Sequence, residues 1–208
     1  DVYKRQLVGQ AVNEALVIDF TQHLDHILEL NREERWVRVQ PGIVLDELNA
    51  FLRPYGLQFG PDPASSNCAA MGGIVSNNST GSHSIQYGMT ADHVIGIEAL
   101  LSDGTEASFG PLDGDQLAQR VKRAGLEGGA YRGIYRIATD AVDEILAGTP
   151  RHWRRCGGYN LDRFVEGASF KHPQDSRFNM AKLVCGSEGT LAVMRELQLN
   201  LGPTPTHT

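Results

Sequence analysis

Two loop-forming stretches between residues 61 and 82 constrain this chain more than any other feature of its sequence. Pro61–Asn67 and Asn77–Ser82 are dominated by Pro, Asn, Asp, Gly, Ser and Thr, and they enclose the small apolar segment Ala69–Val75. Neither stretch suits regular secondary structure, and Gly72-Gly73 between them predicts a turn. Such residues allow the backbone to approach a ligand closely. Ordinary surface turns use the same residues, so both interpretations stay open at this point.

The rest of the chain predicts a mixture of strands and helices. Apolar or alternating runs predict strands at Ala15–Phe20, Trp36–Gln40, His93–Leu101, Thr105–Phe109, Lys182–Cys185 and Leu191–Leu201, with a polar stretch at Thr21–Leu30. Helical spacing of apolar residues predicts helices over Ile43–Leu52, Gln116–Arg123 and Tyr131–Leu146. Because strands and helices do not alternate regularly, the expected fold class is α+β rather than a doubly wound parallel sheet.

Length and charge exclude some classes of partner. The 208 residues allow one large domain or two small ones, with a substantial core. The formal net charge is −6 and the basic residues are scattered, which argues against nucleic acid or an anionic membrane surface as a partner. A phosphorylated cofactor would therefore be held mainly by main-chain N–H groups.

Cysteines, histidines and hydropathy give further expectations. The three cysteines, Cys68, Cys156 and Cys185, form no Cys-x-x-Cys pair, as is typical of reduced thiols in a cytoplasmic protein. His23 and His26 lack an accompanying carboxylate motif, so no metal site is predicted. No apolar run approaches the roughly 20 residues of a membrane span. We expect a cytoplasmic location, which leaves open peripheral contact with the inner face of the membrane.

A dinucleotide cofactor would need a site for its doubly charged pyrophosphate. Proteins bind this group at a helix N-terminus behind a Gly-x-Gly-x-x-Gly turn, or with N–H groups of loops. No Gly-x-Gly-x-x-Gly follows a predicted strand, which disfavours a Rossmann site. Gly72-Gly73, Asn78 and Gly81 fit the loop arrangement, since they present N–H groups without bulky side chains.

The first six residues, Asp1–Gln6, resemble the translation of a transposon adapter, and we exclude residues 1–6 from the fold. An ordinary polar terminus is the alternative. On the adapter interpretation, the chain begins where a sequenced fragment began.

Four motifs stand in an order that resembles a known family. They are Pro61–Ser66, Met71–Asn78 with Gly81, Tyr87-Gly88 with Asp92–Val94, and Gly186–Val193. Together they resemble the FAD-binding domain of the FAD-linked oxidase family, the vanillyl-alcohol oxidase or PCMH type, which includes D-lactate, glycolate and D-2-hydroxyglutarate dehydrogenases. The resemblance covers most of Leu7–Pro203. It implies two α+β subdomains, an incomplete one at residues 7–56 and a second at 57–203, with a helical insertion at about 110–180.

The resemblance implies FAD as the cofactor. The residues it assigns to FAD are Gly9, Gln10, Pro61, Asp62, Ala64, Ser65, Met71, Gly72, Gly73, Asn78, Gly81, Gly88, Ser187, Glu188, Gly189 and Val193. Gly9 and Gln10 would be the tail of the first FAD loop, and Ser187–Gly189 would close over the cofactor. His83 stands where family members often carry Arg. We interpret it as a solvated loop histidine rather than a flavin-facing proton carrier.

The resemblance also implies a reaction, the oxidation of a 2-hydroxy acid by hydride transfer to FAD. Asn77–Gly81 and Gly157–Asp162 are similar to large members fused to an iron–sulfur module, which implies iron–sulfur clusters in a C-terminal part outside this chain. The catalytic base would come from the following substrate domain, so no catalytic residue is predicted and the fragment alone is expected to be inactive. No motif identifies the electron acceptor.

Two alternative functions stay open. The first is a non-catalytic flavin-binding module that relays electrons to an iron–sulfur partner. The second is a flavin reductase of the cell-wall precursor pathway, which ranks lower because those reductases lack a segment like Gly157–Asp162. We interpret Arg154-Arg155 as a solvated charged surface rather than an attraction for an acidic substrate or an electron-transfer partner.

Overall fold

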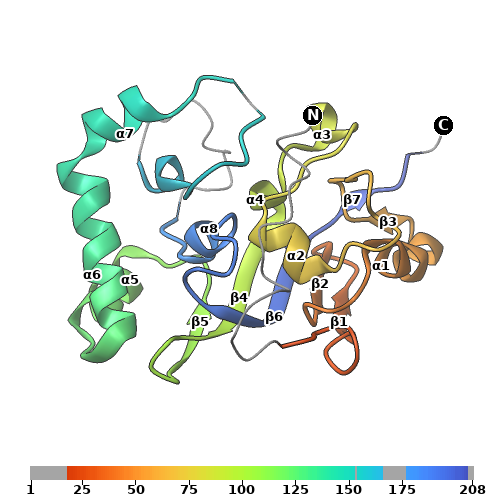
Figure 1. The fold of residues 1–208 in the computed structure, drawn as a ribbon, viewed down its shortest axis with the longest axis horizontal. Helices are drawn as coiled ribbons and strands as arrows, with labels where there is room; N and C mark the ends of the chain where they lie inside the picture. Colours follow the sequence, from red (N-terminus) through yellow and green to blue (C-terminus); the bar gives the residue numbers. More distant parts are fainter. Residues whose placement is uncertain (1–17, 153, 166–176, 206–208) are drawn as a thin grey trace.

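A computed structural model describes residues 18–152, 154–165 and 177–205 of the chain. Its centre is a five-stranded sheet in the order β1-β2-β6-β4-β5, in which every neighbouring pair is antiparallel (Figure 1). The strands are β1 (Ile27–Asn31), β2 (Trp36–Val39), β4 (Val94–Leu100), β5 (Glu106–Phe109) and β6 (Val193–Asn200). A separate two-stranded sheet pairs β3 (Leu57–Gln58) with β7 (Gly202–Pro203).

The late strand β6 joins the early and middle parts of the chain. Val37 of β2 pairs with Leu199 of β6, and Ile97 of β4 pairs with Leu197. Strands from residues 7–56 therefore share one sheet with strands from residues 57–203. The subdomain boundary near residue 56 stays a prediction.

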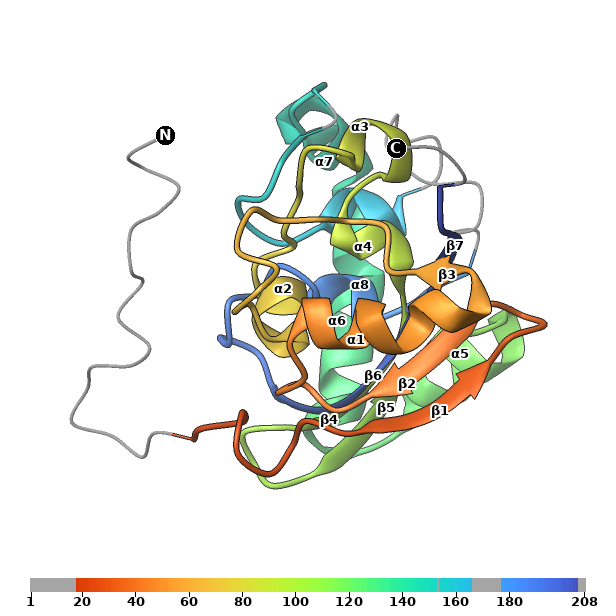
Figure 2. The ribbon, with the colours of Figure 1, turned by 90° about the vertical axis from the view of Figure 1, so that its right-hand side faces the viewer.

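The two faces of the sheet differ in polarity. Val37, Val39 and Leu197 are fully buried and belong to the main core cluster. The alternating positions are polar, and Arg38 on β2 forms an ion pair of 2.9 Å with Glu29 on β1. Figure 2 shows helices above one face of the sheet. A sheet that buries one face and exposes the other to water reads as alternating apolar and polar residues, as these strands do.

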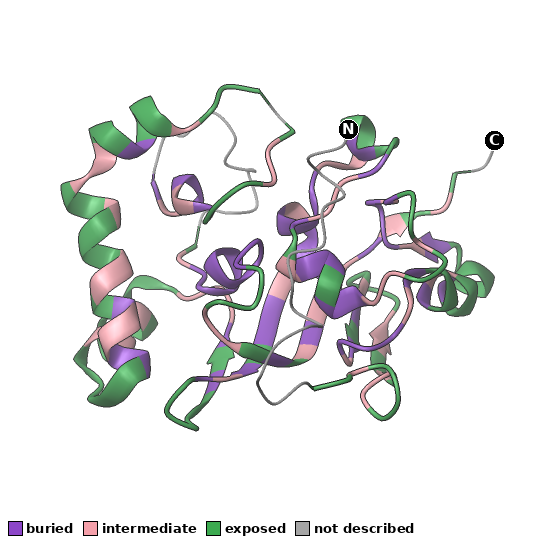
Figure 3. Ribbon diagram, in the orientation of Figure 1, coloured by how far each residue is buried: buried purple, intermediate pink, exposed green. Residues whose placement is uncertain are grey.

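The helices form two groups. The helices α1 (Leu45–Leu52), α2 (Met71–Ser76), α4 (Thr90–His93) and α8 (Ala181–Val184) carry buried residues, while α3 (Ser84–Tyr87) and the 3₁₀ turns η2 (Arg53–Tyr55) and η3 (Leu161–Phe164) complete the connections. The helices α5 (Gly114–Lys122), α6 (Gly125–Asp140) and α7 (Val142–Gly148) form a column at one side and are largely exposed (Figures 1 and 3). Fully buried Tyr131 anchors α6 through ring contacts with Phe109 and Phe178.

The α+β class is confirmed, as are the strands expected near residues 36–40, 93–101, 105–109 and 191–201. The strand expected at Lys182–Cys185 is wrong, since Ala181–Val184 is the helix α8. Its residues are all buried, so the run carries no period that separates strand from helix. Among the described residues, every helix is too short or too polar to span a bilayer.

Three further expectations are corrected. Of the strand expected at Ala15–Phe20, the described part, Ile18–Phe20, is not in a strand, and half of Ile18 is exposed; residues 15–17 lie outside the described residues. The stretch Thr21–Leu30 runs into the strand β1, which was missed because none of its residues is buried and its apolar positions do not alternate cleanly. The single helix expected over Tyr131–Leu146 is divided at Ala141 between α6 and α7.

Candidate functional site

A cleft of about 1450 Å³ lies where several segments distant in the sequence meet. Its lining residues are Ile18–Thr21, Pro41, Asp62–Ser65, Ala70, Gly72, Gly73, Ser76, Asn77, Ser79–Ser82, Arg154, Cys156, Gly157, Glu188, Gly189 and Ala192–Met194. Ligand pockets in proteins commonly measure about 300–1,000 Å³. This cleft therefore has room for a ligand larger than an ordinary small metabolite.

The cleft brings together nine of the residues expected at the cofactor site. These are Asp62, Ala64, Ser65, Gly72, Gly73, Gly81, Glu188, Gly189 and Val193. Five others do not line it, namely Pro61, Met71, Asn78, Gly88 and Ser187. Gly9 and Gln10 lie outside the described residues.

The two loops expected from the sequence lie against each other at the cleft. His83 donates its backbone N–H to Asp62 Oδ1 at 2.9 Å, its Nδ1 lies 2.5 Å from Asp62 Oδ2, and Ser82 Oγ donates to the same oxygen at 3.0 Å. A Cβ added to Gly81 would lie 1.8 Å from Asp62 O, so the contact requires glycine. Partial burial would raise the pKa of Asp62, but the hydrogen bonds from His83 and Ser82 outweigh it and lower the pKa. The aspartate therefore joins the loops as an anion.

Gly72 and Gly73 lie in the helix α2 and not in the turn expected from the sequence. A Cβ on Gly72 would lie 2.7 Å from Pro41 Cβ, so this glycine serves close packing. Gly73 is exposed, and a Cβ there would have no neighbour within 4 Å. The same is true of Gly157 and Gly189, which also line the cleft. Three bare backbone positions thus face this space, as close approach of a ligand to the main chain requires.

The segment after α8 closes the cleft by docking on α2. Gly186 N–H donates to Val75 O at 3.0 Å, and Glu188 N–H donates to Ser76 O at 2.9 Å. Glu188 has a left-handed backbone with φ 50°, and Gly189 follows with φ 78°. This conformation is costly for a residue with a side chain. The docking therefore fixes an uncommon backbone course beside the cleft.

Sequence reasoning missed one wall of the cleft, formed by Arg154, Cys156 and Gly157. Arg154 Nε donates a hydrogen bond of 3.0 Å to Thr80 Oγ1, and Cys156 Sγ lies 3.9 Å from the same oxygen. Arg155, the next residue, forms an ion pair with buried Asp162 instead. The interpretation as a solvated surface is therefore wrong for Arg155, whereas Arg154 is exposed, as expected, and also lines the cleft. The only signal in the sequence was their position just before Gly157-Gly158.

Cys156 lines the cleft, whereas Cys185 lies in the interior. Cys185 is fully buried, and burial raises its pKa to about 12, so it stays a thiol. Within the described ranges, no three His, Cys, Asp or Glu residues come together as a metal site.

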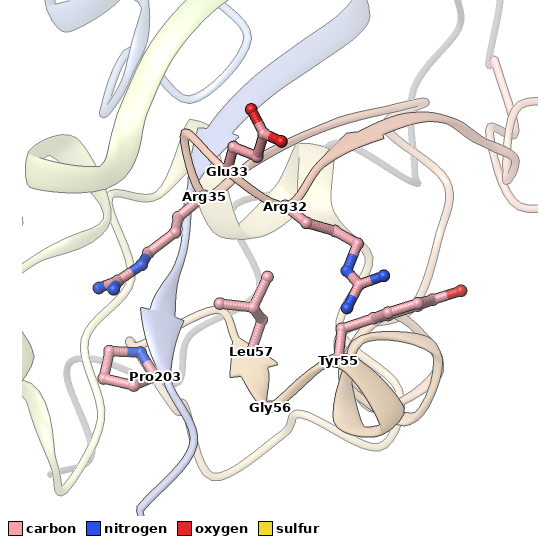
Figure 4. Close-up of a pocket in the computed structure, with 7 residues that line it drawn as sticks. All are labelled: Arg32, Glu33, Arg35, Tyr55, Gly56, Leu57 and Pro203. Atoms are coloured by element: carbon pink, nitrogen blue, oxygen red, sulfur yellow. The ribbon is translucent and has the colours of Figure 1, made fainter.

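A second hollow, of about 530 Å³, shares no residue with the cleft. In Figure 4 the guanidinium groups of Arg32 and Arg35 lie on opposite sides of Leu57, and Glu33 points away. Arg32 Cζ lies 4.9 Å from the centre of the Tyr55 ring, so this arginine stacks on the aromatic face. None of the described residues expected at the cofactor site contributes to this hollow.

The structure is an α+β domain with one large cleft, at which Gly73, Gly157 and Gly189 leave the main chain uncovered. A family model described as "FAD binding domain" matches residues 4–110, so the chain belongs to this FAD-binding family and its cofactor is FAD.

Several curated relatives match nearly the whole chain. The chain is 36% identical over 199 residues to a D-2-hydroxyglutarate dehydrogenase of Pseudomonas putida and 33% identical over 201 residues to one of Escherichia coli, with 96% and 95% of this chain covered. It spans 19% of the length of each of these relatives. A glycolate oxidase subunit GlcD of Bacillus subtilis is 33% identical over 96 residues, covering 46% of this chain and 20% of the relative.

Two solved structures of alkyldihydroxyacetonephosphate synthase share the fold. Their TM-scores are 0.56 and 0.51 at 19% and 20% identity. They cover 97% and 90% of this chain, which corresponds to 28% and 23% of theirs.

Proposed function

We propose that this chain forms part of the FAD site of an enzyme that oxidises a 2-hydroxy acid. The FAD would enter the cleft between α2, the loops at residues 61–65 and 77–83, and the segment Gly186–Val193 that follows α8. The observation that carries this proposal is the group of bare backbone positions, Gly73, Gly157 and Gly189, around one large cleft. Among the described residues that line the cleft, Arg154 is the one Lys or Arg, so backbone N–H groups have to contribute most of the binding of a phosphorylated cofactor.

The chain's own residues have distinct parts in this site. Gly73 and Gly189 allow the cofactor to contact the main chain, and Ala64 and Ser65 form a wall of small side chains. Asp62 does not point at the ligand as a free carboxylate, because His83 and Ser82 bind it. FAD, when bound, supplies the hydride acceptor for oxidation of an alcohol carbon. The protein binds it, orients it and excludes water from it.

The relatives suggest the class of substrate. The curated proteins that match nearly the whole chain act on D-2-hydroxyglutarate, while the glycolate and D-lactate enzymes match less than half of it. We therefore propose D-2-hydroxyglutarate as the first substrate to test, ahead of D-lactate and glycolate. Iron–sulfur clusters in the full-length protein, and a cytoplasmic location with peripheral membrane contact, stay predictions.

The test uses the full-length protein, purified and reconstituted with FAD under anaerobic conditions. We expect a yellow protein whose flavin absorbance bleaches on addition of D-2-hydroxyglutarate. A protein that stays colourless after reconstitution would overturn the proposed cofactor site. A yellow protein that none of the three hydroxy acids reduces would overturn the enzymatic proposal and favour the electron-relay module.

A further inference from the structure

A hydrogen bond to Thr80 holds the side chain of Arg154 at the cleft. Its Nε donates to Thr80 Oγ1 at 3.0 Å, across 74 positions of sequence. Thr80 itself lines the cleft, in the loop that follows α2. The hydrogen bond therefore holds the guanidinium group against the loop that follows α2, at the wall of the cleft.

The charges around the cleft make this arginine unusual. Among the described lining residues, Asp19, Asp62 and Glu188 are acidic, and Arg154 is the one Lys or Arg. Asp62 is hydrogen-bonded by His83 and Ser82, and the side chain of Asp19 accepts hydrogen bonds from Thr21 N–H and Oγ1. The side chains that line the cleft therefore carry a formal excess of negative charge, which Arg154 offsets only in part.

A flavin dinucleotide has one anionic part, and that part would have to be accommodated among the charges of the cleft. The isoalloxazine ring, the ribityl chain and the adenosine are neutral at pH 7, whereas the pyrophosphate carries two negative charges. An anion that enters a cleft with acidic walls needs compensating positive charge, and a guanidinium group matches phosphate oxygens in geometry as well as in charge.

We propose, on the basis of the proposed FAD site, that Arg154 binds the pyrophosphate of FAD and is the side-chain counter-charge for it. Thr80 is then a positioning residue that orients Arg154. The charge of the guanidinium carries the effect, and main-chain N–H groups near Gly73, Gly157 and Gly189 contribute the rest of the binding.

The experiment measures flavin affinity and not turnover. Full-length apoprotein of the wild type, Arg154→Gln and Arg154→Lys is titrated with FAD and with riboflavin, which lacks phosphate, and binding is followed by flavin fluorescence. Arg53→Gln is the matched control, because it removes the same charge from an exposed position that does not line the cleft. Circular dichroism melting curves show whether each variant is folded.

We expect Arg154→Gln to weaken FAD binding about tenfold or more, the loss typical of a hydrogen bond to a charged group. Riboflavin affinity should not change, Arg154→Lys should restore part of the FAD affinity, and the difference from wild type should shrink at high salt. Arg53→Gln should bind FAD as the wild type does.

Three results would overturn the proposal. If Arg154→Gln binds FAD with wild-type affinity, the arginine serves another group, and a raised KM for the hydroxy acid would assign it to the substrate carboxylate. If FAD and riboflavin are weakened equally, Arg154 acts on the ring or on the fold. A wild-type protein that binds neither flavin overturns the FAD site itself, and the inference with it.

Discussion

Asn78 and Asn160, 82 positions apart in the sequence, meet in the buried interior behind the cleft, where Asn78 Nδ2 donates a hydrogen bond of 3.4 Å to Asn160 Oδ1. Asn160 Nδ2 donates in turn to Lys182 O at 3.1 Å and to Cys185 O at 2.7 Å. Asn78 Oδ1 accepts the backbone N–H of Ala91 at 2.8 Å. Two amide side chains therefore connect the loop that follows α2 with α4 and with the C-terminal end of α8.

Replacing Asn78 should lower stability more than it lowers flavin affinity. The side chain is 1% exposed, and its loss leaves the Ala91 N–H without an acceptor. Asn78 also has φ 48°, a conformation that alanine adopts at a cost. We expect Asn78→Ala to reduce the free energy of unfolding by about 3 kcal/mol in urea titrations. Exposed Asn67→Ala should change it by less than about 0.5 kcal/mol. Full stability combined with lost flavin would instead indicate that Asn78 touches the cofactor.

Substitution of the two adjacent glycines of α2 should affect different properties, namely flavin binding at Gly73 and stability at Gly72. A side chain on Gly73 meets no atom within 4 Å and projects into the cleft, so Gly73→Val should fold normally and lose FAD. Gly72→Ala places a Cβ 2.7 Å from Pro41 Cβ, so it should cost about 1–3 kcal/mol of stability through overpacking. Melting temperature and bound flavin, measured on both variants, distinguish the two effects. A Gly73→Val protein that still binds FAD with wild-type affinity would contradict the placement of the cofactor against α2.

The buried arginine of η3 should matter far more than a surface one. Arg163 is 1% exposed at its side chain and lies 2.6 Å from Asp92 Oδ1. Arg163→Met leaves Asp92 without this partner and should destabilise the protein by about 3–5 kcal/mol. Arg195→Met removes an exposed ion pair with Glu106 and should cost at most about 1 kcal/mol. Equal losses in the two variants, measured by urea unfolding, would show that burial does not set the strength of these pairs.

Stability should fall on mild acidification because of His93. Burial lowers the pKa of His93 below its ordinary 6.5, although Tyr87 O, Asn200 O and Asp92 favour the charged ring. Between the folded pKa and 6.5 the unfolded chain binds more protons than the folded one, so the free energy of unfolding decreases as pH drops through this window. Urea titrations at about pH 7.5 and about pH 5.5 measure the decrease.

Two variants separate this effect from other titrations. His93→Gln should make the stability less dependent on pH over this range, whereas exposed His23→Gln should leave the dependence as in the wild type. An unchanged pH dependence in His93→Gln would assign the decrease to other groups.

Local sequence determined those parts of the fold whose residues follow one clear period. Val37 and Val39 alternate with polar neighbours and form β2, and Leu45, Leu48 and Leu52 recur at helical spacing and form α1. The same local signal failed for Ala181–Val184, because a short run that is buried all round has no period. It also failed for Gly72-Gly73, whose low helix propensity is overridden by packing of α2 against Pro41.

The sequence alone determined two motifs, Met71–Asn78 with Gly81 and Gly186–Val193. Through them it also determined the class of the cofactor. Only the tertiary structure decided which of those residues face the cleft and which support it from behind. The missing side chain of a glycine can leave room for a ligand, as at the open position of Gly73. It can also allow close packing, as in the contact of Gly81 with Asp62. The two uses look identical in a sequence, because the neighbours that distinguish them come from distant segments. For the same reason the sequence did not predict Arg154 at the cleft, because its position depends on a hydrogen bond to Thr80, 74 positions earlier in the chain.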